Sequence, residues 1–472
     1  MSQLRDIRST GGERQVLLQN PYHEYAVRFI ELGARKYGCK AVCVYTDPRE
    51  RIRQERSFPI LRSDLIAASY DAGRIGPKEL AGQLAGRHRI AAVLPFNEPG
   101  VLPAAELAQE LGLSWGQPAI VGRIADKFAL KEHLRGARPD LGINASRRVD
   151  GLADVLAARA LPVYRRFVLK PVSGFGNRDI GVFDAASPIR RIEAYLHGLA
   201  GVPVLMEEYI DGLEYFVNGQ IDAAGAVVVF AAFQYIRIPA NGRDNIDFET
   251  LLVRRADPKF DVLAQYASAV VSASGLRRSP FHVELKLDQS GPRLIEVGAR
   301  LAGLGNAWLC NHLHSSKLDL MDLAMHYYLH DSEYGPLHLD WKSYDASAVR
   351  YVHGIAARSE YVYRIDGVRA VEALPEFHAW VNRPTVGVRL KRTTDILTMP
   401  YSLILKGRRQ ADLAVAAERV RGLLRWNGSV GVARRLRLNA QLRLERYAMG
   451  LRVRVVSLWR GALAHRLPAR FR

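Results

Sequence analysis

The chain has 472 residues, 48% hydrophobic and 24% charged, a composition that excludes a mostly disordered protein. Its formal net charge is +19, but eleven arginines and one glutamate lie between Ser429 and Arg472, so +10 of that excess belongs to the last tenth of the chain. The remaining body is only mildly basic, and we expect no specific nucleic-acid partner.

Cysteine usage and hydropathy place the protein in a reducing, aqueous compartment. Cys39, Cys43 and Cys310 are too few for a disulfide scaffold, and we expect buried thiols. The first residues lack the apolar core of a signal peptide. The longest apolar run, Ala223 to Phe233, is shorter than the ~18 residues that span a bilayer. We therefore expect a cytoplasmic protein.

The first 121 residues predict a small α/β domain. Short apolar runs at 15–19, 40–45 and 90–95 are typical of strands, and the amphipathic stretch 24–37 is typical of a helix. Strands that alternate with helices indicate a parallel sheet. No G-x-G-x-x-G follows the first strand, which argues against a dinucleotide site there.

The pattern then changes to short β-rich runs between Gly, Asp and Asn turns. Residues 122–335 predict an α+β domain with antiparallel sheets, with strands at 167–171, 204–209, 226–232, 281–287 and 292–297 and a helix over 262–274. A smaller domain, 336–427, follows with strands at 348–352 and 385–390 and a helix at 411–424.

The middle domain holds two segments suited to an anionic ligand. In VLKPVSGFGNRDIGV a strand delivers Lys170, and Ser173, Gly174 and Gly176 form a loop whose backbone can approach an anion. Lys127, in ADKFALKEHL, supplies a second cation, although a helix-surface lysine is ordinarily solvated.

The segment MEEYIDG, from Met206 to Gly212, predicts a strand that ends in an exposed turn. Backbone groups of Glu208 and Ile210 could pair with the polar edge of a purine, and Glu214 could accept from ribose hydroxyls. An ordinary strand–turn–strand with solvated acids explains the same pattern.

Two carboxylates interrupt apolar strands in FHVELKL and RLIEVGARLAGLG. A turn at 288–291 joins these strands as a hairpin, so Glu284 and Glu296 can face each other. Two carboxylates with phosphate oxygens suit Mg²⁺. The fork of Arg300 suits a carboxylate or phosphoryl group, and an ion pair with Glu296 is the structural alternative.

In this order the segments resemble the ATP-grasp superfamily over residues 15–425. The resemblance implies a pre-ATP-grasp α/β domain, a two-lobed ATP-grasp domain and a small C-terminal domain, with ATP and Mg²⁺ (or Mn²⁺ in its place) as cofactors. It implies that Lys127 and Lys170 contact the ATP phosphates under the loop Ser173–Gly176. It further assigns adenine to Glu207, Glu208, Tyr209 and Ile210, ribose to Glu214, the metal to Glu284 and Glu296, and the transferred phosphoryl group to Arg300.

One position departs from the family pattern. Many members carry Asn two residues after the second metal carboxylate, where this chain has Gly298. Branches similar to the bacterial L-amino acid ligases also lack the Asn. The third region resembles the C-terminal domain of that same branch.

The resemblance implies an ATP-dependent ligase that joins a small carboxylate and an amine, both amino-acid-like, through an acyl phosphate. Two alternatives stay open, namely a ligase acting on a peptide or an acyl- or peptidyl-carrier protein, and a non-catalytic nucleotide-binding scaffold. His312 and His314 could line an acceptor pocket or pack a helix, and Arg243 and Asp244 fit an exposed turn.

The C-terminal residues 428–472 carry apolar positions at helical spacing with arginines mostly off that stripe. Such a tail could bind an acidic carrier protein or an anionic membrane surface, or pack on the body with a solvated basic face. The sequence also leaves a homodimer open.

Overall fold

The computed structural model describes residues 14–21, 23–73, 75–113, 115–174, 176, 179–303, 305–310, 313–314, 319–330, 339–427, 436–437 and 440. Within these ranges no helix is both long and apolar enough to cross a membrane. The predicted basic tail lies outside the described residues except for Leu436, Arg437 and Ala440.

The N-terminal apolar runs at 15–19, 40–45 and 90–95 form strands of a parallel sheet, as the sequence predicts. An unpredicted strand, β3, completes its four-stranded order β3-β2-β1-β4. Val16, Leu17 and Leu18 are fully buried, as expected for a strand covered on both faces. The elements are β1 (Gln15–Gln19), α1 (His23–Tyr37), β2 (Lys40–Tyr45), α2 (Pro48–Ser57), η1 (Pro59–Arg62), β3 (Ile66–Asp71), α3 (Pro77–Leu84), β4 (Ile90–Pro95) and α4 (Glu98–Glu110).

A small antiparallel lobe follows α5 (Pro118–Ala125) and α6 (Lys127–Ala137). Its strands run in the order β5-β8-β6-β7, and Phe167, Leu169 and Met206 belong to its separate core. The lobe comprises η2 (Pro139–Leu141), β5 (Ser146–Val149), α7 (Leu152–Arg159), η3 (Pro162–Tyr164), β6 (Arg166–Pro171), β7 (Gly181–Asp184), α8 (Ile189–Gly198) and β8 (Val204–Glu208).

The largest sheet has eight strands in the order β13-β12-β9-β10-β11-β14-β19-β17, all antiparallel. It continues past residue 336, where the sequence analysis places a domain boundary. The strands are β9 (Leu213–Ile221), β10 (Val227–Ala240), β11 (Arg243–Val253), β12 (Ser279–Asp288), β13 (Gly291–Gly298), β14 (Ala348–His353), β17 (Phe377–Asn382) and β19 (Ser402–Gly407), with α9 (Pro258–Ser274) packed on them.

The hairpin of β10 and β11 is longer than the sequence predicts. Asn241 and Gly242 make its two-residue turn, both with positive φ (55° and 78°), which matches the twist of the flanking strands. Arg243 and Asp244 therefore begin β11, with exposed side chains.

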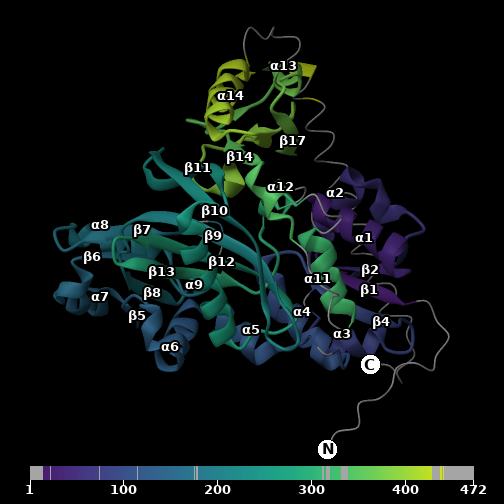
Figure 1. Cartoon of the computed structure of the whole chain (residues 1–472), viewed down its shortest axis with the longest axis horizontal. Helices are drawn as coiled ribbons and strands as arrows, with labels where there is room; N and C mark the ends of the chain where they lie inside the picture. The colour runs from purple at the N-terminus through teal and green to yellow at the C-terminus, as the bar shows by residue number, and fades with distance from the viewer. Residues whose placement is uncertain are drawn as a thin grey trace, which may run out of the picture.

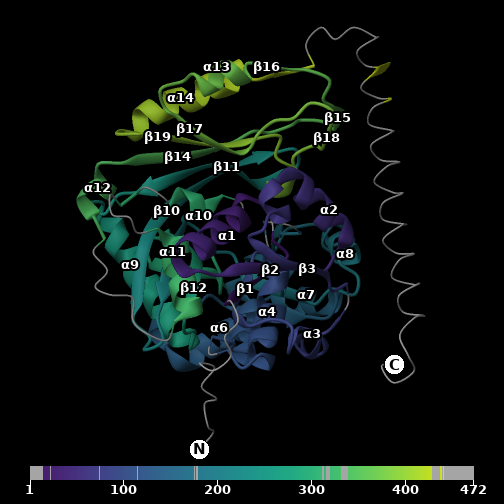
Figure 2. The same ribbon diagram turned by 90° about the vertical axis from the view of Figure 1, so that its right-hand side faces the viewer.

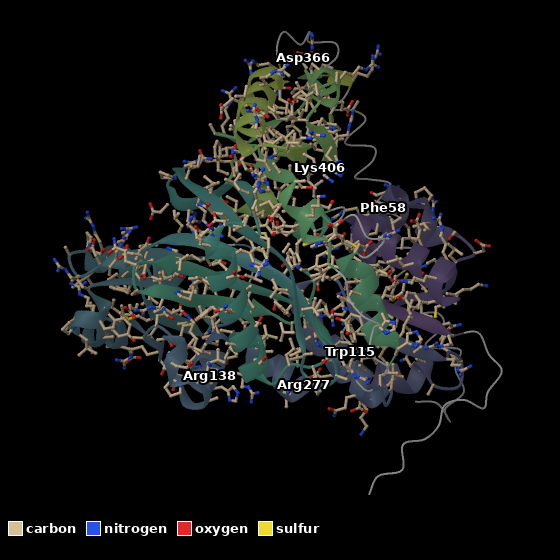
Figure 3. All side chains as sticks on the ribbon, in the orientation of Figure 1. Phe58, Trp115, Arg138, Arg277, Asp366 and Lys406 are labelled. Carbon is tan, nitrogen blue, oxygen red and sulfur yellow. The ribbon has the colours of Figure 1, made fainter. Side chains whose placement is uncertain are left out.

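The chain returns to the first sheet before it completes the C-terminal region. Helix α11 (Leu320–Leu329) packs against α1 and β4. Its Tyr328 lies edge-on to Trp115, with ring centroids 4.9 Å apart. Figure 3 labels Trp115 in the lower part of the molecule. The remaining elements are α10 (Asn306–Leu309), α12 (Trp341–Asp345), β15 (Glu360–Tyr361), β16 (Ile365–Asp366), α13 (Val368–Glu372), β18 (Arg389–Leu390), η4 (Ile396–Thr398), α14 (Gln410–Leu423) and β20 (Arg425–Trp426). The strand predicted over 385–390 is thus only two residues long.

Figures 1 and 2 show how these parts surround the centre of the molecule. The parallel sheet and the small lobe lie on either side of the large sheet in Figure 1. The yellow-green C-terminal elements, which include β14, β17 and β19 at one end of that sheet, lie at the top in both views. Residues from all four parts can therefore meet in one place.

Candidate active site

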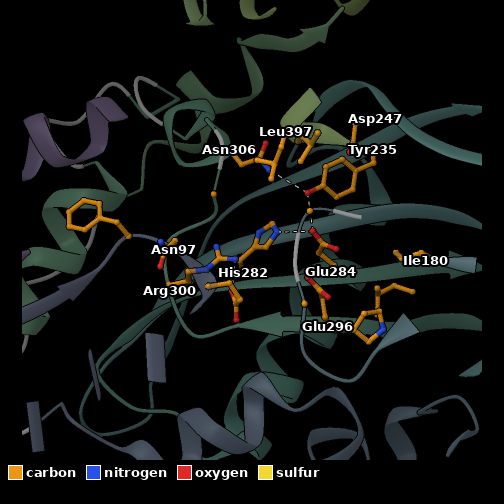
Figure 4. Close-up of a pocket in the computed structure, with 18 of the residues that line it drawn as sticks. Asn97, Ile180, Tyr235, Asp247, His282, Glu284, Glu296, Arg300, Asn306 and Leu397 are labelled. Carbon is orange, nitrogen blue, oxygen red and sulfur yellow. Dashed lines mark hydrogen bonds and ion pairs between the residues drawn. The ribbon is translucent and has the colours of Figure 1, made fainter. Parts of the chain in front are cut away.

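A cavity of about 560 Å³ lies where the parts of the molecule meet. The parallel sheet unit contributes Phe96, Asn97 and Glu98, and the small lobe contributes Lys170 and Gly176. Figure 4 shows Glu284, Glu296, His282 and Arg300 pointing into this space from the large sheet and the loop beyond it. Ile396 and Leu397 of η4 complete the wall.

The two predicted metal carboxylates lie directly opposite each other on the β12–β13 hairpin. Glu284 Oε1 accepts hydrogen bonds from the Tyr235 hydroxyl and from His282 Nε2, each at 3.0 Å. Glu296 pairs with Lys127 Nζ at 3.1 Å. Burial opposes ionisation of Glu296, but the positive charges of Lys127 and Lys170 hold its pKa below its usual value.

This pair fits a partial magnesium site. The described residues hold no cluster of three or more His, Cys, Asp or Glu suited to a metal. Mg²⁺ commonly takes one or two protein carboxylates and completes its shell with water and phosphate oxygens. The carboxylates of Glu284 and Glu296 would supply that part of the shell.

Lys127 begins α6, where the Asp126 side chain caps the helix by accepting from Ala129 N. Its ammonium group donates to the carbonyl oxygen of Gly174 at 2.8 Å, in the predicted phosphate loop. Burial opposes the charge, but Glu296 and Glu98 raise the pKa of Lys127 above its usual value. Lys127 thus connects the glycine loop to the carboxylate pair.

Lys170, near the end of β6, pairs with the buried carboxylate of Glu207, a residue that the resemblance assigns to adenine. Glu207 lies between Lys170 Nζ at 2.7 Å and Lys131 Nζ at 2.5 Å. Burial alone would raise the pKa of Glu207, but the two lysines lower it to about 2. Burial and the nearby Lys170 lower the pKa of Lys131 to about 8. Glu207 and Lys131 therefore form a charged pair at neutral pH.

Sequence reasoning missed Lys131, which also donates to Asn144 Oδ1 at 2.7 Å. The available signal was its position four residues after Lys127 and three residues from both Phe128 and Leu134 on the same helix. Its side chain is almost fully buried. A buried lysine needs such partners because an unpaired charge is costly to bury.

The residues predicted to hold the nucleoside lie outside the described cavity wall. Glu208 and Ile210 already use their carbonyl oxygens, which accept from Asn144 Nδ2 at 3.0 Å and Lys286 Nζ at 2.9 Å. The side chains of Arg166 and Lys286 both lie over the Tyr209 ring, 3.6 Å and 4.6 Å from its centroid. Glu207 to Ile210, Ser173 and Glu214 are absent from the lining residues in the described part of the chain.

Glu214, which the resemblance assigns to ribose, pairs with an arginine in the structure. It accepts from Arg237 through both oxygens, with Nε to Oε2 at 3.0 Å, and Arg237 also pairs with Asp247. Arg237 and Asp247 do line the cavity. The structure therefore brings an arginine of β10, unforeseen from the sequence, into the site.

Arg300 makes a contact that crosses between domains. Its Nη2 lies 2.5 Å from Oε2 of Glu98, the first residue of α4, and both side chains are largely buried. The predicted structural alternative, a pair of Glu296 with Arg300, is wrong because each has another partner.

Gly298 lies beside this ion pair. A Cβ there would lie 3.8 Å from Arg300 Cζ and from Glu98 Oε2, which is an ordinary van der Waals distance. The position that many ATP-grasp proteins fill with Asn is therefore next to the Glu98–Arg300 pair in this chain.

The other candidate residues have structural roles or lie outside the description. His314 is buried, bonds the carbonyl oxygen of Phe230 at 3.1 Å and stacks on Tyr344, so it packs the core. Burial lowers its pKa. His312 lies outside the described residues. All three cysteines are buried thiols, as predicted.

Comparisons with known proteins agree with this arrangement. Residues 164–307 match the family model of the ATP-grasp domain. Dapdiamide A synthase of Enterobacter agglomerans is 31% identical over 167 residues, covering 34% of this chain and 39% of the synthase. An uncharacterized protein of Sinorhizobium fredii is 24% identical over 54% of this chain and 55% of its own length. The matches thus span about half or less of these curated relatives.

Solved structures extend the likeness to most of the chain. The L-amino acid ligase of Bacillus licheniformis superposes with a TM-score of 0.71 at 16% identity, over 89% of this chain and 99% of that one. N5-carboxyaminoimidazole ribonucleotide synthetase of Thermotoga maritima gives 0.60 at 14% identity, over 88% and 99%. The predicted fold is confirmed: residues 164–307 match an ATP-grasp domain, and most of the chain shares the fold of the L-amino acid ligase.

Proposed function

We propose that this protein is an ATP-dependent ligase that joins a carboxylate and an amine, both amino-acid-like, and releases ADP and phosphate. The observation that carries the proposal is the facing pair Glu284 and Glu296, with Lys127 and Arg300 on the same cavity. The likeness to an L-amino acid ligase in fold and to dapdiamide A synthase in sequence supports it.

The first step is phosphoryl transfer. A substrate carboxylate oxygen bonds to the γ-phosphorus of ATP, the bond from that phosphorus to the β,γ-bridging oxygen breaks, and ADP leaves. This chemistry depends on positioning and charge neutralisation, which Lys127 and Lys170 supply as point charges. Mg²⁺ bound by Glu284 and Glu296 would neutralise further phosphate charge.

The second step forms the amide bond. The amine nitrogen bonds to the acyl carbon, the carbon–oxygen bond to phosphate breaks, and a proton passes from nitrogen to the departing phosphate. Negative charge develops on the acyl oxygen, and a buried guanidinium stabilises such charge strongly. Arg300 takes this role in the proposal.

The cavity charges also favour a zwitterionic substrate. Glu98 and Arg300 form an ion pair at 2.5 Å on the cavity wall. An amino acid carries the complementary ammonium and carboxylate groups, and could replace each partner of this ion pair. The proposed substrate class is therefore amino-acid-like.

A coupled assay for ADP release, run over a matrix of amino-acid pairs, tests the proposal. We expect ADP and phosphate to form in equal amounts with the amide product, and Glu296→Gln to abolish the signal. Release of AMP contradicts the mechanism. ATP binding without turnover favours the scaffold, and mass addition to a carrier protein favours the macromolecular acceptor.

A further inference from the structure

Asn306, the first residue of α10, lies on the cavity wall beside the carboxylate pair (Figure 4). Its Nδ2 lies 3.3 Å from the Tyr235 hydroxyl, which in turn lies 3.0 Å from Glu284 Oε1. A tyrosine hydroxyl has one proton to donate. Because the Glu284 carboxylate can only accept, the proton of Tyr235 points to Glu284.

This chain of hydrogen bonds determines how the Asn306 amide is turned. The Tyr235 oxygen must accept from Asn306, so the amide nitrogen faces Tyr235. The amide oxygen, Oδ1, then lies on the opposite side of the carboxamide. It is buried and has no hydrogen-bond partner among the residues that the structure describes.

The same loop presents a second polar atom without a partner. Arg300 Nε is buried and makes no hydrogen bond within the described part of the chain, although Nη1 and Nη2 do. Both residues line the cavity. Buried polar groups are ordinarily paired, so an acceptor and a donor left over on one wall indicate a ligand with the complementary groups.

The position of Asn306 is also well supported. Gly305 adopts φ +94°, and the space beside it is filled by the Tyr351 hydroxyl and Val381. The Asn306 amide N–H donates to the carbonyl oxygen of Gly303 at 3.1 Å. The wall therefore holds Asn306 in place before any ligand binds.

We propose that Asn306 Oδ1 accepts a hydrogen bond from the primary amine nucleophile. This inference rests on the proposed ligase function. A primary amine has two N–H groups, of which only one is lost when the amide forms. The other can donate to Asn306 and direct the nitrogen lone pair toward the acyl carbon, while Arg300 donates to the acyl oxygen. Asn306 is then a binding residue for the amine and takes no part in phosphoryl transfer.

The test compares two reactions in Asn306→Ala. Positional isotope exchange in β,γ-bridge ¹⁸O-labelled ATP, with an active carboxylate substrate alone, reports the first step. The KM for an active L-amino acid as amine reports the second. We expect that KM to rise about tenfold, the effect of one lost hydrogen bond, and the isotope exchange to fall far less. Asn306→Asp keeps an acceptor oxygen and gives a smaller rise in KM than Asn306→Ala.

Two further variants complete the design. Tyr235→Phe removes the bond to Glu284 and is expected to slow both reactions by similar factors. Gln83→Ala removes an exposed carboxamide of α3 that bonds Glu79 and serves as the control. Thermal melting establishes that each variant is folded.

The outcomes separate this inference from the proposed function. Equal losses of exchange and amide formation in Asn306→Ala, or no change in either, overturn the role of Asn306 alone. A wild-type protein without isotope exchange for any carboxylate overturns the ligase proposal, and the inference with it.

Discussion

Replacing Gly305 by alanine tests whether the loop that carries Asn306 must keep its shape. A Cβ at this position would lie 2.6 Å from Val381 Cγ1 and 2.7 Å from the Tyr351 hydroxyl oxygen, closer than real side chains approach. The backbone also lies at φ +94°, which costs a residue with a side chain about 1–2 kcal/mol. Forcing the methyl group into this packing costs about 1–3 kcal/mol more.

The sum, about 2–5 kcal/mol, exceeds what Tyr351 can relieve by moving, because that side chain is 2% exposed and packs edge-on against His353 at 4.2 Å. We expect the loop to shift instead and to displace Asn306. A misplacement of about 1 Å can reduce a rate 10²-fold. The ADP-release assay should therefore show a loss of about 10²-fold in kcat/KM.

The matched control is Gly82→Ala in α3, where a new methyl group meets nothing within 4 Å. Alanine favours a helix over glycine by about 1 kcal/mol, so this variant should melt at an equal or higher temperature and keep full activity. If Gly305→Ala keeps activity within threefold of the wild type, the reasoning on the loop is wrong.

Three further predictions concern the charged groups. Lys131→Met leaves the buried Glu207 with one lysine and should cost about 3 kcal/mol, seen as a lower Tm that Lys131→Met/Glu207→Gln partly restores. The pKa of Glu207, about 2, lies below the usual carboxyl value of 4.5, so its contribution to stability is present above pH 4.5 and is lost as the pH falls toward 2. Between pH 6 and 3 the Tm of the wild type should thus fall more steeply with decreasing pH than the Tm of Glu207→Gln. An equal dependence of Tm on pH in the two proteins would contradict this. Glu284→Gln should raise the Mg²⁺ concentration at half-maximal ADP release by about tenfold or more, because one anionic ligand is lost, and an unchanged Mg²⁺ titration would remove Glu284 from the metal site.

Local sequence patterns were sufficient to predict several strands and the hairpin that carries Glu284 and Glu296. The strands at 15–19, 40–45 and 90–95 coincide with β1, β2 and β4 because buried parallel strands are continuous apolar runs. The carboxylates of the β12–β13 hairpin could be paired because the turn that joins them is short. Strand β3 escaped prediction because its residues are mostly half-exposed and lack a clear alternation.

The residues that sequence reasoning missed depend on contacts between distant segments. Glu98 meets Arg300, and Lys131 meets Glu207, only after three separate units have packed together. Strand β11 was not predicted because its first residues, Arg243 and Asp244, are charged. Its partner strand β14 follows in the chain only after the β12–β13 hairpin, so their pairing has no local signal. No local spacing encodes such pairings.

The antiparallel ladder that passes from β11 to β14 has a practical consequence for fragments of this protein. A truncation that ends before Ala348 would leave the backbone N–H and C=O groups of β11 without the β14 partner that Glu249 to Leu251 now have. Bare strand edges of this kind recruit other chains. Expression of a fragment that ends before Ala348 should therefore yield aggregates, whereas the 472-residue chain stays dispersed.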